Sequence, residues 1–166
     1  MKLSAKMGRG GVMTLCPPLS RTPVFTVTEE KGGAVCHVRA KDGSYLASLE
    51  RDTAIRGSLI FNVYKGSVRV GTVAAAERVS KDPDALPVLS FSWGKREFDG
   101  HILTAPIWES DARRRRELAE IRKTLRGFVL RLTKGISQGD ACDAVLALSA
   151  VMIWDRVRKR QGGGSL

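Results

Sequence analysis

The sequence contains few of the side chains that most often hold metal ions or carry out catalysis. Only two histidines occur, His37 and His101, and neither has a carboxylate or cysteine at ligand spacing, so a packing or solvent-facing role is expected for both. The three cysteines, Cys16, Cys36 and Cys142, are far apart and form no C-x-x-C pair. A disulfide framework and a zinc site are therefore not expected, and free thiols fit a reducing compartment.

Motifs of known catalytic sites are also missing. The chain has no G-x-S-x-G, P-loop, Rossmann glycine pattern or EF-hand loop. Asp82 and Asp84 flank a proline, an arrangement that more often makes a turn than a calcium site. The sequence thus predicts a protein that is not an enzyme and that carries neither a cofactor nor a metal.

Long apolar runs are scarce. Lys6, Arg9 and several glycines interrupt the first 20 residues, so a secretory signal is not expected. The longest apolar stretch, residues 141–154, would form a helix of about 21 Å, whereas a bilayer core needs about 20 apolar residues. An intracellular, cytoplasmic protein is expected, with peripheral membrane contact as an option. Four basic residues and no acid among residues 1–28 leave a mitochondrial transit peptide as a minor alternative.

What the chain does contain is a series of short runs of β-favouring residues separated by turns. Asp42-Gly43, between residues 34–40 and 45–51, is the clearest hairpin signal. A second hairpin is expected around Lys65-Gly66. Further strands are expected over the ranges 24–28, 88–93 and 96–105, and in residues 106–110. The spacing predicts a mainly β domain, a sandwich or barrel of antiparallel strands.

Residues 113–135 fit two structures. The apolar residues between 118 and 125 match one stripe of a helix, whereas those from 128 to 132 alternate as in a strand. Gly127 interrupts any continuous helix. We expect two strands around a turn at residues 125–127, and a helix in place of the first strand is the alternative.

The C-terminal segment predicts a helix over residues 141–160. Asp140 is the expected N-cap, and the basic residues near the end suit the negative end of the helix dipole. Only Asp143 and Ser149 are polar between residues 141 and 154, so no face of this helix suits water. Burying its large apolar side chains is worth roughly 10–20 kcal/mol. We therefore expect a closed or strongly curved antiparallel sheet, threaded or filled by this helix.

The order of these elements resembles a known superfamily. GSYLASLER, NVYKGSVRVGTV, LAEIRK, GFVLRLTKG and the apolar helix DACDAVLALSAVMIWDRV follow one another as in the tubby C-terminal-like superfamily. That group includes tubby proteins, phospholipid scramblases and LURP-one-related proteins. The ending is also similar to a domain family from mushroom-forming fungi. The resemblance implies a closed barrel around a hydrophobic C-terminal helix, and binding of phosphoinositide headgroups through basic side chains.

The expected layout is a flexible basic tail at residues 1–22, one domain at 23–161 and a flexible glycine-rich tail at 162–166. The net charge of +11 is unevenly spread, because residues 29–110 hold equal numbers of basic and acidic residues. The excess lies in the first 28 residues, in residues 111–134 and at the end of the helix. A general basic coat would not be confined in this way.

Two basic clusters are the best candidates for a binding site, because several of their cations should face water and attract phosphate. The predicted anion-binding residues are Arg113, Arg114, Arg115, Arg116, Arg156, Arg158, Lys159 and Arg160. If both clusters lie at the same end of the domain, they form one phosphate-binding surface, and if not, the lipid hypothesis weakens. Arginines that only aid solubility, and cations that only cap the helix, are the plain alternatives.

The predicted function is therefore non-enzymatic recognition of anionic phospholipid headgroups or another phosphate-bearing surface. A protein interaction module and a nucleic-acid-binding protein are the alternatives, and the oligomeric state is left open. Nucleic acid is the weaker of the two, because aromatic residues make up only 6% of the chain and mostly lie outside the basic segments. Modules that stack bases need aromatic side chains beside their phosphate contacts.

Overall fold

The computed structural model describes residues 1–52, 59–78, 88–93, 96–101, 104–111, 114–125 and 127–162. Side chains are described for 1–52, 60–73, 107, 116–125, 127–157 and 159–160. The strands are β1 (Lys2–Met7), β2 (Val12–Cys16), β3 (Phe25–Glu30), β4 (Val35–Ala40), β5 (Tyr45–Arg51), β6 (Leu59–Lys65), β7 (Val68–Arg78), β8 (Val88–Trp93), β9 (Arg96–His101), β10 (Thr104–Asp111), β11 (Arg114–Thr124) and β12 (Gly127–Leu132). A short 3-10 helix, η1 (Arg9–Gly11), joins β1 to β2, and one α-helix, α1 (Gln138–Gly162), ends the chain.

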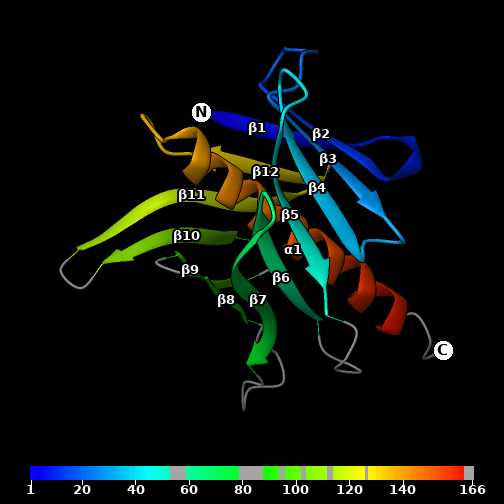
Figure 1. Cartoon of the computed structure of the whole chain (residues 1–166), viewed down its shortest axis with the longest axis vertical. Coiled ribbons are helices and arrows are strands. Elements are labelled where there is room, and N and C mark those ends of the chain that lie inside the picture. Colours follow the sequence, from blue (N-terminus) through cyan, green and yellow to red (C-terminus); the bar gives the residue numbers. More distant parts are fainter. Residues whose placement is uncertain are drawn as a thin grey trace.

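Each strand pairs antiparallel with its neighbours along the chain, from β1 with β2 through to β11 with β12. The first strand also pairs with the last, with Lys2 opposite Arg131 and Ser4 opposite Val129. Figure 1 shows β1 and β12 side by side, with α1 passing along the concave side of the sheet. Strands from opposite ends of the sequence therefore share one sheet.

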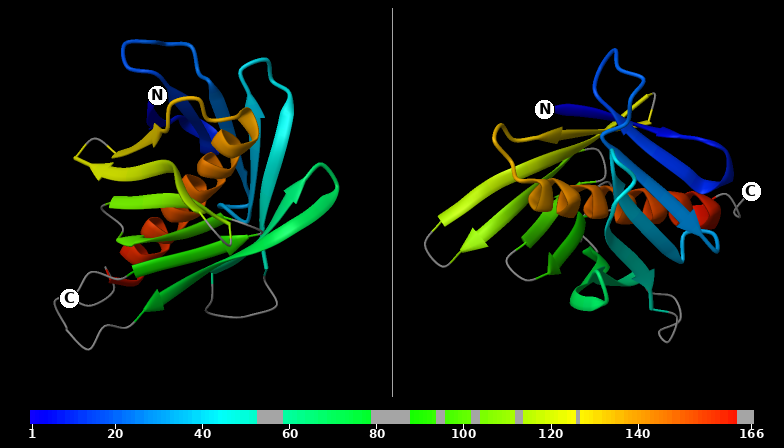
Figure 2. Two further views of the ribbon diagram at one scale, coloured as in Figure 1. Left: turned by 90° about the vertical axis from the view of Figure 1, so that its left-hand side faces the viewer. Right: turned by 45° about the horizontal axis from the view of Figure 1, so that its top comes forward.

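The helix α1 is covered on all its faces over its first half. Every residue from Ala141 to Val151 is buried. The helix contacts β4, β5 and β7 on one side and β11 and β12 on another, so strands far apart in the sheet meet it from different directions (Figure 2). The prediction of a mainly β antiparallel fold with a C-terminal helix packed on the sheet is confirmed.

Alternation of side chains along the strands builds the core around α1. Leu3, Leu130 and Ile121 occupy one cross-strand row in β1, β12 and β11, and all three are fully buried. Their chain neighbours Lys2, Arg131 and Arg122 point to the outer face and are exposed. One face of the sheet thus faces the helix and the other faces water, as period-two patterning requires.

The hairpin around Asp42-Gly43 is confirmed. Asp42 accepts hydrogen bonds from the backbone N–H of Ser44 at 2.9 Å and from its hydroxyl at 2.6 Å. Gly43 has φ of +84°, a conformation that glycine adopts without steric cost. The two-strand prediction for residues 113–135 is confirmed as well, because β11 and β12 are joined by a turn at Leu125.

The prediction of a flexible tail at residues 1–22 is wrong. β1 and β2 lie in that segment, and β1 pairs with both β2 and β12. Leu3, Met13 and Leu15 are buried in the same core as the helix, which supplies the free energy that orders these strands. Asp82 and Asp84, where the sequence indicates a turn, and residues 163–166 of the predicted C-terminal tail lie outside the described residues.

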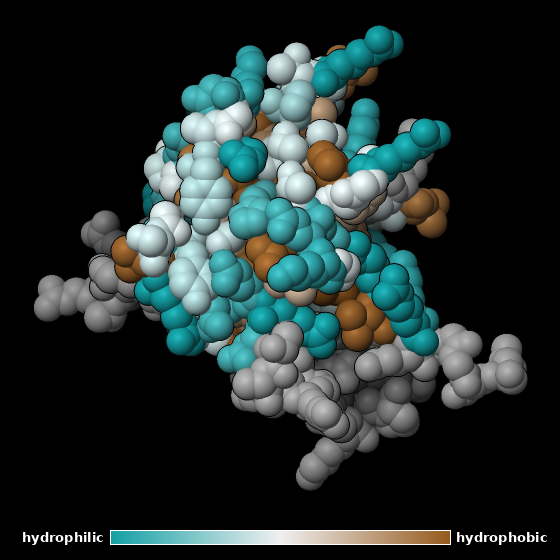
Figure 3. All heavy atoms as spheres, turned by 45° about the vertical axis from the view of Figure 1, so that its right-hand side comes forward, coloured by the Kyte–Doolittle hydropathy of each residue, from teal (hydrophilic) through white to brown (hydrophobic). Residues whose placement is uncertain are grey.

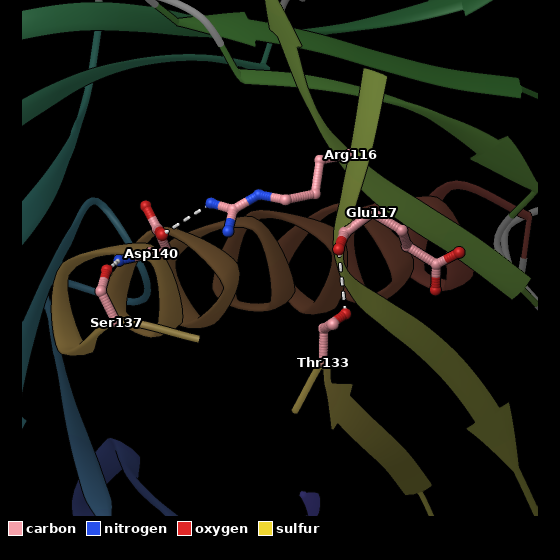
Figure 4. A network of polar contacts seen from close by, with 5 residues as sticks. All are labelled: Arg116, Glu117, Thr133, Ser137 and Asp140. Carbon is pink, nitrogen blue, oxygen red and sulfur yellow. Dashed lines mark hydrogen bonds and ion pairs between the residues drawn. The ribbon is translucent and has the colours of Figure 1, made fainter. Parts of the chain in front are cut away.

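The helix begins three residues before its predicted start, and its cap is not Asp140. The backbone N–H of Asp140 donates to the Ser137 hydroxyl at 3.1 Å, so Ser137 is the capping side chain. Asp140 lies in the first turn and faces Arg116, as Figure 4 shows. The acidic residue still suits the positive end of the helix dipole, although it does not cap it.

The outer surface is largely hydrophilic on the face shown in Figure 3, where apolar side chains appear in separate spots. Among the described residues, no helix has both the length and the apolar content that crossing a membrane requires. The three cysteines, Cys16, Cys36 and Cys142, are free and buried.

Candidate functional site: a basic groove on the outer face of the sheet

The first predicted cluster lies at the start of β11. The Arg116 guanidinium is exposed and lies 3.3 Å from a carboxylate oxygen of Asp140, at the beginning of α1 (Figure 4). The backbone of Arg114 and Arg115 belongs to β11, but their side chains lie outside the described residues, and so does the whole of Arg113. Of this cluster, the structure therefore gives contacts for Arg116 only.

The second predicted cluster lies at the end of α1, and much of its charge is paired. Arg156 contacts Glu29 at 2.7 Å, and Lys159 contacts Asp155 at 3.0 Å. Arg160 is exposed and forms no ion pair with any residue whose side chain is described, and the side chain of Arg158 lies outside that set. Two cations of this cluster thus form ion pairs with carboxylates of the protein, and Arg160 is exposed to solvent.

Asp155 is the centre of this pairing. Its carboxylate accepts a hydrogen bond from Lys123 of β11 at 2.7 Å and contacts Lys159 on its other oxygen. Burial raises the pKa of this carboxyl, but the hydrogen bonds and charges of the two lysines outweigh burial and hold the pKa below its ordinary value. The carboxylate is therefore ionised at neutral pH and fixes the end of α1 to β11.

The two predicted clusters lie at opposite ends of the helix. β11 runs alongside α1, with Arg116 facing Asp140 near its start and Lys123 facing Asp155 near its end. Fifteen helical residues separate these two aspartates, which corresponds to about 23 Å. Figure 1 shows the start of β11 and the end of α1 on opposite sides of the molecule. Arg116 and the end of α1 therefore do not share one surface, which is the alternative under which a lipid hypothesis based on these two clusters weakens.

A third group of cations, which the sequence pattern did not single out, is brought together by strand pairing. Lys2 of β1, Arg131 of β12 and Arg122 of β11 line a groove of about 200 Å³ on the outer face of the sheet, together with Thr124 and Val129. We call this the basic groove. Lys2 is directly opposite Arg131, and Val129 is directly opposite Arg122, so the register of three strands sets its shape.

The basic groove has more positive than negative charge. A single carboxylate, Glu120, contacts both arginines, at 3.0 Å from Arg122 and 3.6 Å from Arg131. Lys2 forms no ion pair with any of the described residues. Both arginine side chains keep more than half of their surface in solvent, with 53% exposed for Arg122 and 65% for Arg131. Three cations around one acid, all open to solvent, are suited to contact phosphate oxygens.

A fully exposed apolar side chain lies beside the basic groove. Leu125 follows Thr124 at the tip of the β11–β12 hairpin and packs against none of the core. Met7, at the end of β1, is also half exposed. A protruding leucine next to a basic surface is an arrangement that peripheral membrane proteins use, because the apolar side chain enters the lipid while the cations remain at the headgroups.

The sequence pattern indicates part of the basic groove. Glu120, Arg122 and Thr124 alternate with buried residues in β11, as Val129 and Arg131 do in β12. Lys2 is 129 positions before Arg131, and nothing in the local pattern of either segment indicates that they pair. The basic groove therefore depends on a long-range pairing that periodicity alone does not reveal.

The described side chains offer little for covalent catalysis. Burial raises the pKa of the Cys36 and Cys142 thiols to about 12, with the nearby carboxylates of Glu29 and Asp143 adding to the effect, so neither thiol is a nucleophile at neutral pH. His37 lies 3.5 Å from Glu30 and stacks edgewise on Tyr45 at the surface. No group of three or more potential metal ligands occurs among the described residues.

Comparison with models of protein families, with curated proteins and with solved structures finds no match to this chain.

Proposed function

We propose that this protein is a non-enzymatic binding domain that recognises phosphate-bearing lipid headgroups at an anionic membrane surface. The observation that carries the proposal is the basic groove, in which Lys2, Arg122 and Arg131 come from three neighbouring strands and a single carboxylate, Glu120, contacts the two arginines. Strand pairing holds the three backbones in fixed register, so less ordering is needed when an anion binds.

The magnitudes favour a membrane over a free phosphate. Each lysine or arginine near an anionic surface contributes about 1 kcal/mol, so the groove alone gives weak binding. Leu125 adds roughly 1.5–3 kcal/mol if it is buried in the lipid interface, an increment that a soluble phosphate cannot supply. The combination supports an interfacial lipid rather than a small soluble anion.

Of the two clusters predicted from sequence, the one at the end of α1 is the better placed to assist. Lys123, two residues before Leu125, contacts Asp155, and Asp155 also contacts Lys159. Lys159 and Arg160 therefore lie at the same end of the molecule as the exposed leucine. Arg116 lies at the other end, and we assign the cluster at residues 113–116 no part in this contact.

The test is vesicle binding by the double variant Arg122→Gln/Arg131→Gln. Loss of two cations should weaken the partition coefficient on vesicles containing anionic lipid by about 30-fold, which corresponds to about 2 kcal/mol. Vesicles of neutral phosphatidylcholine should bind neither protein. The matched control is Arg39→Gln/Arg69→Gln, which removes the same charge from exposed positions on β4 and β7.

Four outcomes would overturn the proposal. An equal loss in the control double variant would show that only net charge matters. Competition by RNA that is as strong as competition by anionic vesicles at physiological salt would show generic attraction to phosphate. Unchanged binding by Leu125→Ser would remove the argument for an interfacial lipid. A protein partner captured through the same groove would replace the lipid.

We also propose that the sheet is a closed barrel of the tubby C-terminal-like kind. The support is the strand order, in which β1 pairs with both β2 and β12, as in a closed barrel, together with a helix buried on all faces. Hydrogen exchange tests it, because a closed sheet leaves no edge strand. Amides of β1 and β12 that exchange as fast as the turns would contradict closure.

A further inference from the structure

A second concave site lies on the inner side of the sheet, where α1 begins. It is a cavity of about 610 Å³ between the first turn of α1 and the ends of β3, β4 and β12. Its walls include Val24, Phe25, Ala40, Leu132, Ile136 and Ala141. This volume is within the range of pockets that hold small molecules, and walls of this apolar character are typical of them.

Two of the residues that face the cavity are alanines. Ala141 belongs to α1, as Gln138 on the rim does, and Ala40 is the last residue of β4. Further along α1 the side chains of Val145 and Leu148 fill the space between helix and sheet. Two alanines at the entrance therefore leave a volume that larger side chains would occupy.

Met1, whose N-terminal ammonium donates to the Leu132 carbonyl at 2.6 Å, lines the cavity, and Lys41 is the cationic side chain on its rim. Lys41 is exposed in the β4–β5 turn and forms no ion pair within the part of the chain that is described. Its neighbour Asp42 is held by the side-chain and backbone hydrogen bonds of Ser44, which keep the pKa of that carboxyl below its ordinary value. Ser137 and Gln138 complete the rim at the start of α1, where the helix dipole is positive.

We propose that this cavity binds an unbranched amphiphilic carboxylate, with the hydrocarbon chain among the apolar walls and the carboxylate at Lys41. Apolar walls require an apolar body, and the cation at the entrance requires an anionic head of compact size. The site is distinct from the basic groove. Leu132 faces the cavity from inside the sheet while its neighbour Arg131 faces the groove from outside, so this inference does not rest on the proposed function.

The test is calorimetric titration of the purified full chain with n-alkyl carboxylates of eight to fourteen carbons, each below its micellar concentration. Each added methylene should tighten binding by about 4-fold until the cavity is full. The matching alcohols, which lack the charge, should bind about 10-fold more weakly than the carboxylates. Absence of saturable binding across the series would overturn the proposal.

Two variants locate the ligand. Ala40→Leu fills the cavity and should reduce affinity at least 10-fold for every chain length. Lys41→Gln should leave the alcohols unaffected and remove the preference for carboxylates, while Lys31→Gln, in the β3–β4 turn at the other end of the sheet, should change neither. If Ala40→Leu fails to fold, the affinities of Lys41→Gln for the carboxylates and for the matching alcohols still test the proposed site. An unchanged preference in Lys41→Gln, or the same loss in Lys31→Gln, contradicts the proposed site.

Discussion

A helix enclosed by strands should be equally sensitive to truncation on opposite faces, and this can be measured. Leu146 and Leu148 are both fully buried, and at 100° per residue their side chains point about 160° apart around α1. In an ordinary amphipathic helix, one of two such positions would face water. Here both leucines lie in the same core cluster.

The expected cost is the same for both. Replacing a buried leucine by alanine removes its transfer free energy and leaves a cavity, which together amount to about 2–5 kcal/mol. Leu146→Ala and Leu148→Ala should therefore each lower the free energy of unfolding by that amount. Leu125→Ala is the control, because this leucine is fully exposed and its truncation should stay within about 0.5 kcal/mol of the parent.

Urea unfolding followed by tryptophan fluorescence gives these values, provided that the slope of free energy against denaturant is the same for all four proteins. Trp154, on α1 itself, is buried and reports on the helix environment. If Leu148→Ala cost less than about 1 kcal/mol while Leu146→Ala cost more than 2, one face of the helix would be open to solvent. That result would refute the enclosed helix and the closed sheet proposed with it.

Three further predictions concern an ion pair, two buried thiols and a glycine. Asp155→Asn should destabilise the protein by about 1–3 kcal/mol at pH 7. The native pKa of this carboxyl is lowered, so its contribution to the free energy of unfolding is fully present above the ordinary value of 3.8 and is lost as pH falls through the native pKa. In urea unfolding, the difference in stability between the variant and the parent should therefore be smaller at pH 3 than at pH 7. Burial raises the pKa of the Cys36 and Cys142 thiols to about 12, so both should resist a disulfide reagent at pH 8 in the native protein and react once the protein is unfolded. Rapid reaction of either thiol in the native protein would contradict their burial. Gly33→Ala should lower the midpoint of thermal unfolding more than Gly32→Ala does. Both glycines have positive φ, but only at Gly33 would an added Cβ meet other side chains, Arg156 at 3.2 Å and Ile153 at 3.4 Å. An equal decrease in the two variants would show that the backbone conformation alone matters.

The parts of the fold that were predictable depend on local pattern. Asp42-Gly43 indicated its hairpin, because that dipeptide favours a particular tight turn. The absence of any polar face between residues 141 and 154 indicated a buried helix. The first two strands were missed although KLSAKM alternates polar with apolar residues, because the lysines and nearby glycines suggested a disordered tail. What orders them is contact with β12 and the core, which only the folded chain provides.

The candidate site was less accessible from sequence, for a physical reason. A run of like charges such as the four consecutive arginines stands out in a sequence, whereas cations that meet only across paired strands do not. The cations of the basic groove are separate in the sequence and adjacent only across strands. Lys159 and Arg156 were predicted to bind an anionic ligand, and their carboxylate partners Asp155 and Glu29 could not be assigned before the fold was known.

The pairing of β1 with β12 has a consequence for biosynthesis. Arg131 is made 129 residues after its partner Lys2, and the helix that packs in the interior is made after both. Until then the nascent chain displays a half-built sheet with an unoccupied apolar interior, the kind of surface that chaperones recognise. Closure of so long a loop also makes for slow folding, which lengthens the time for which this apolar surface is exposed.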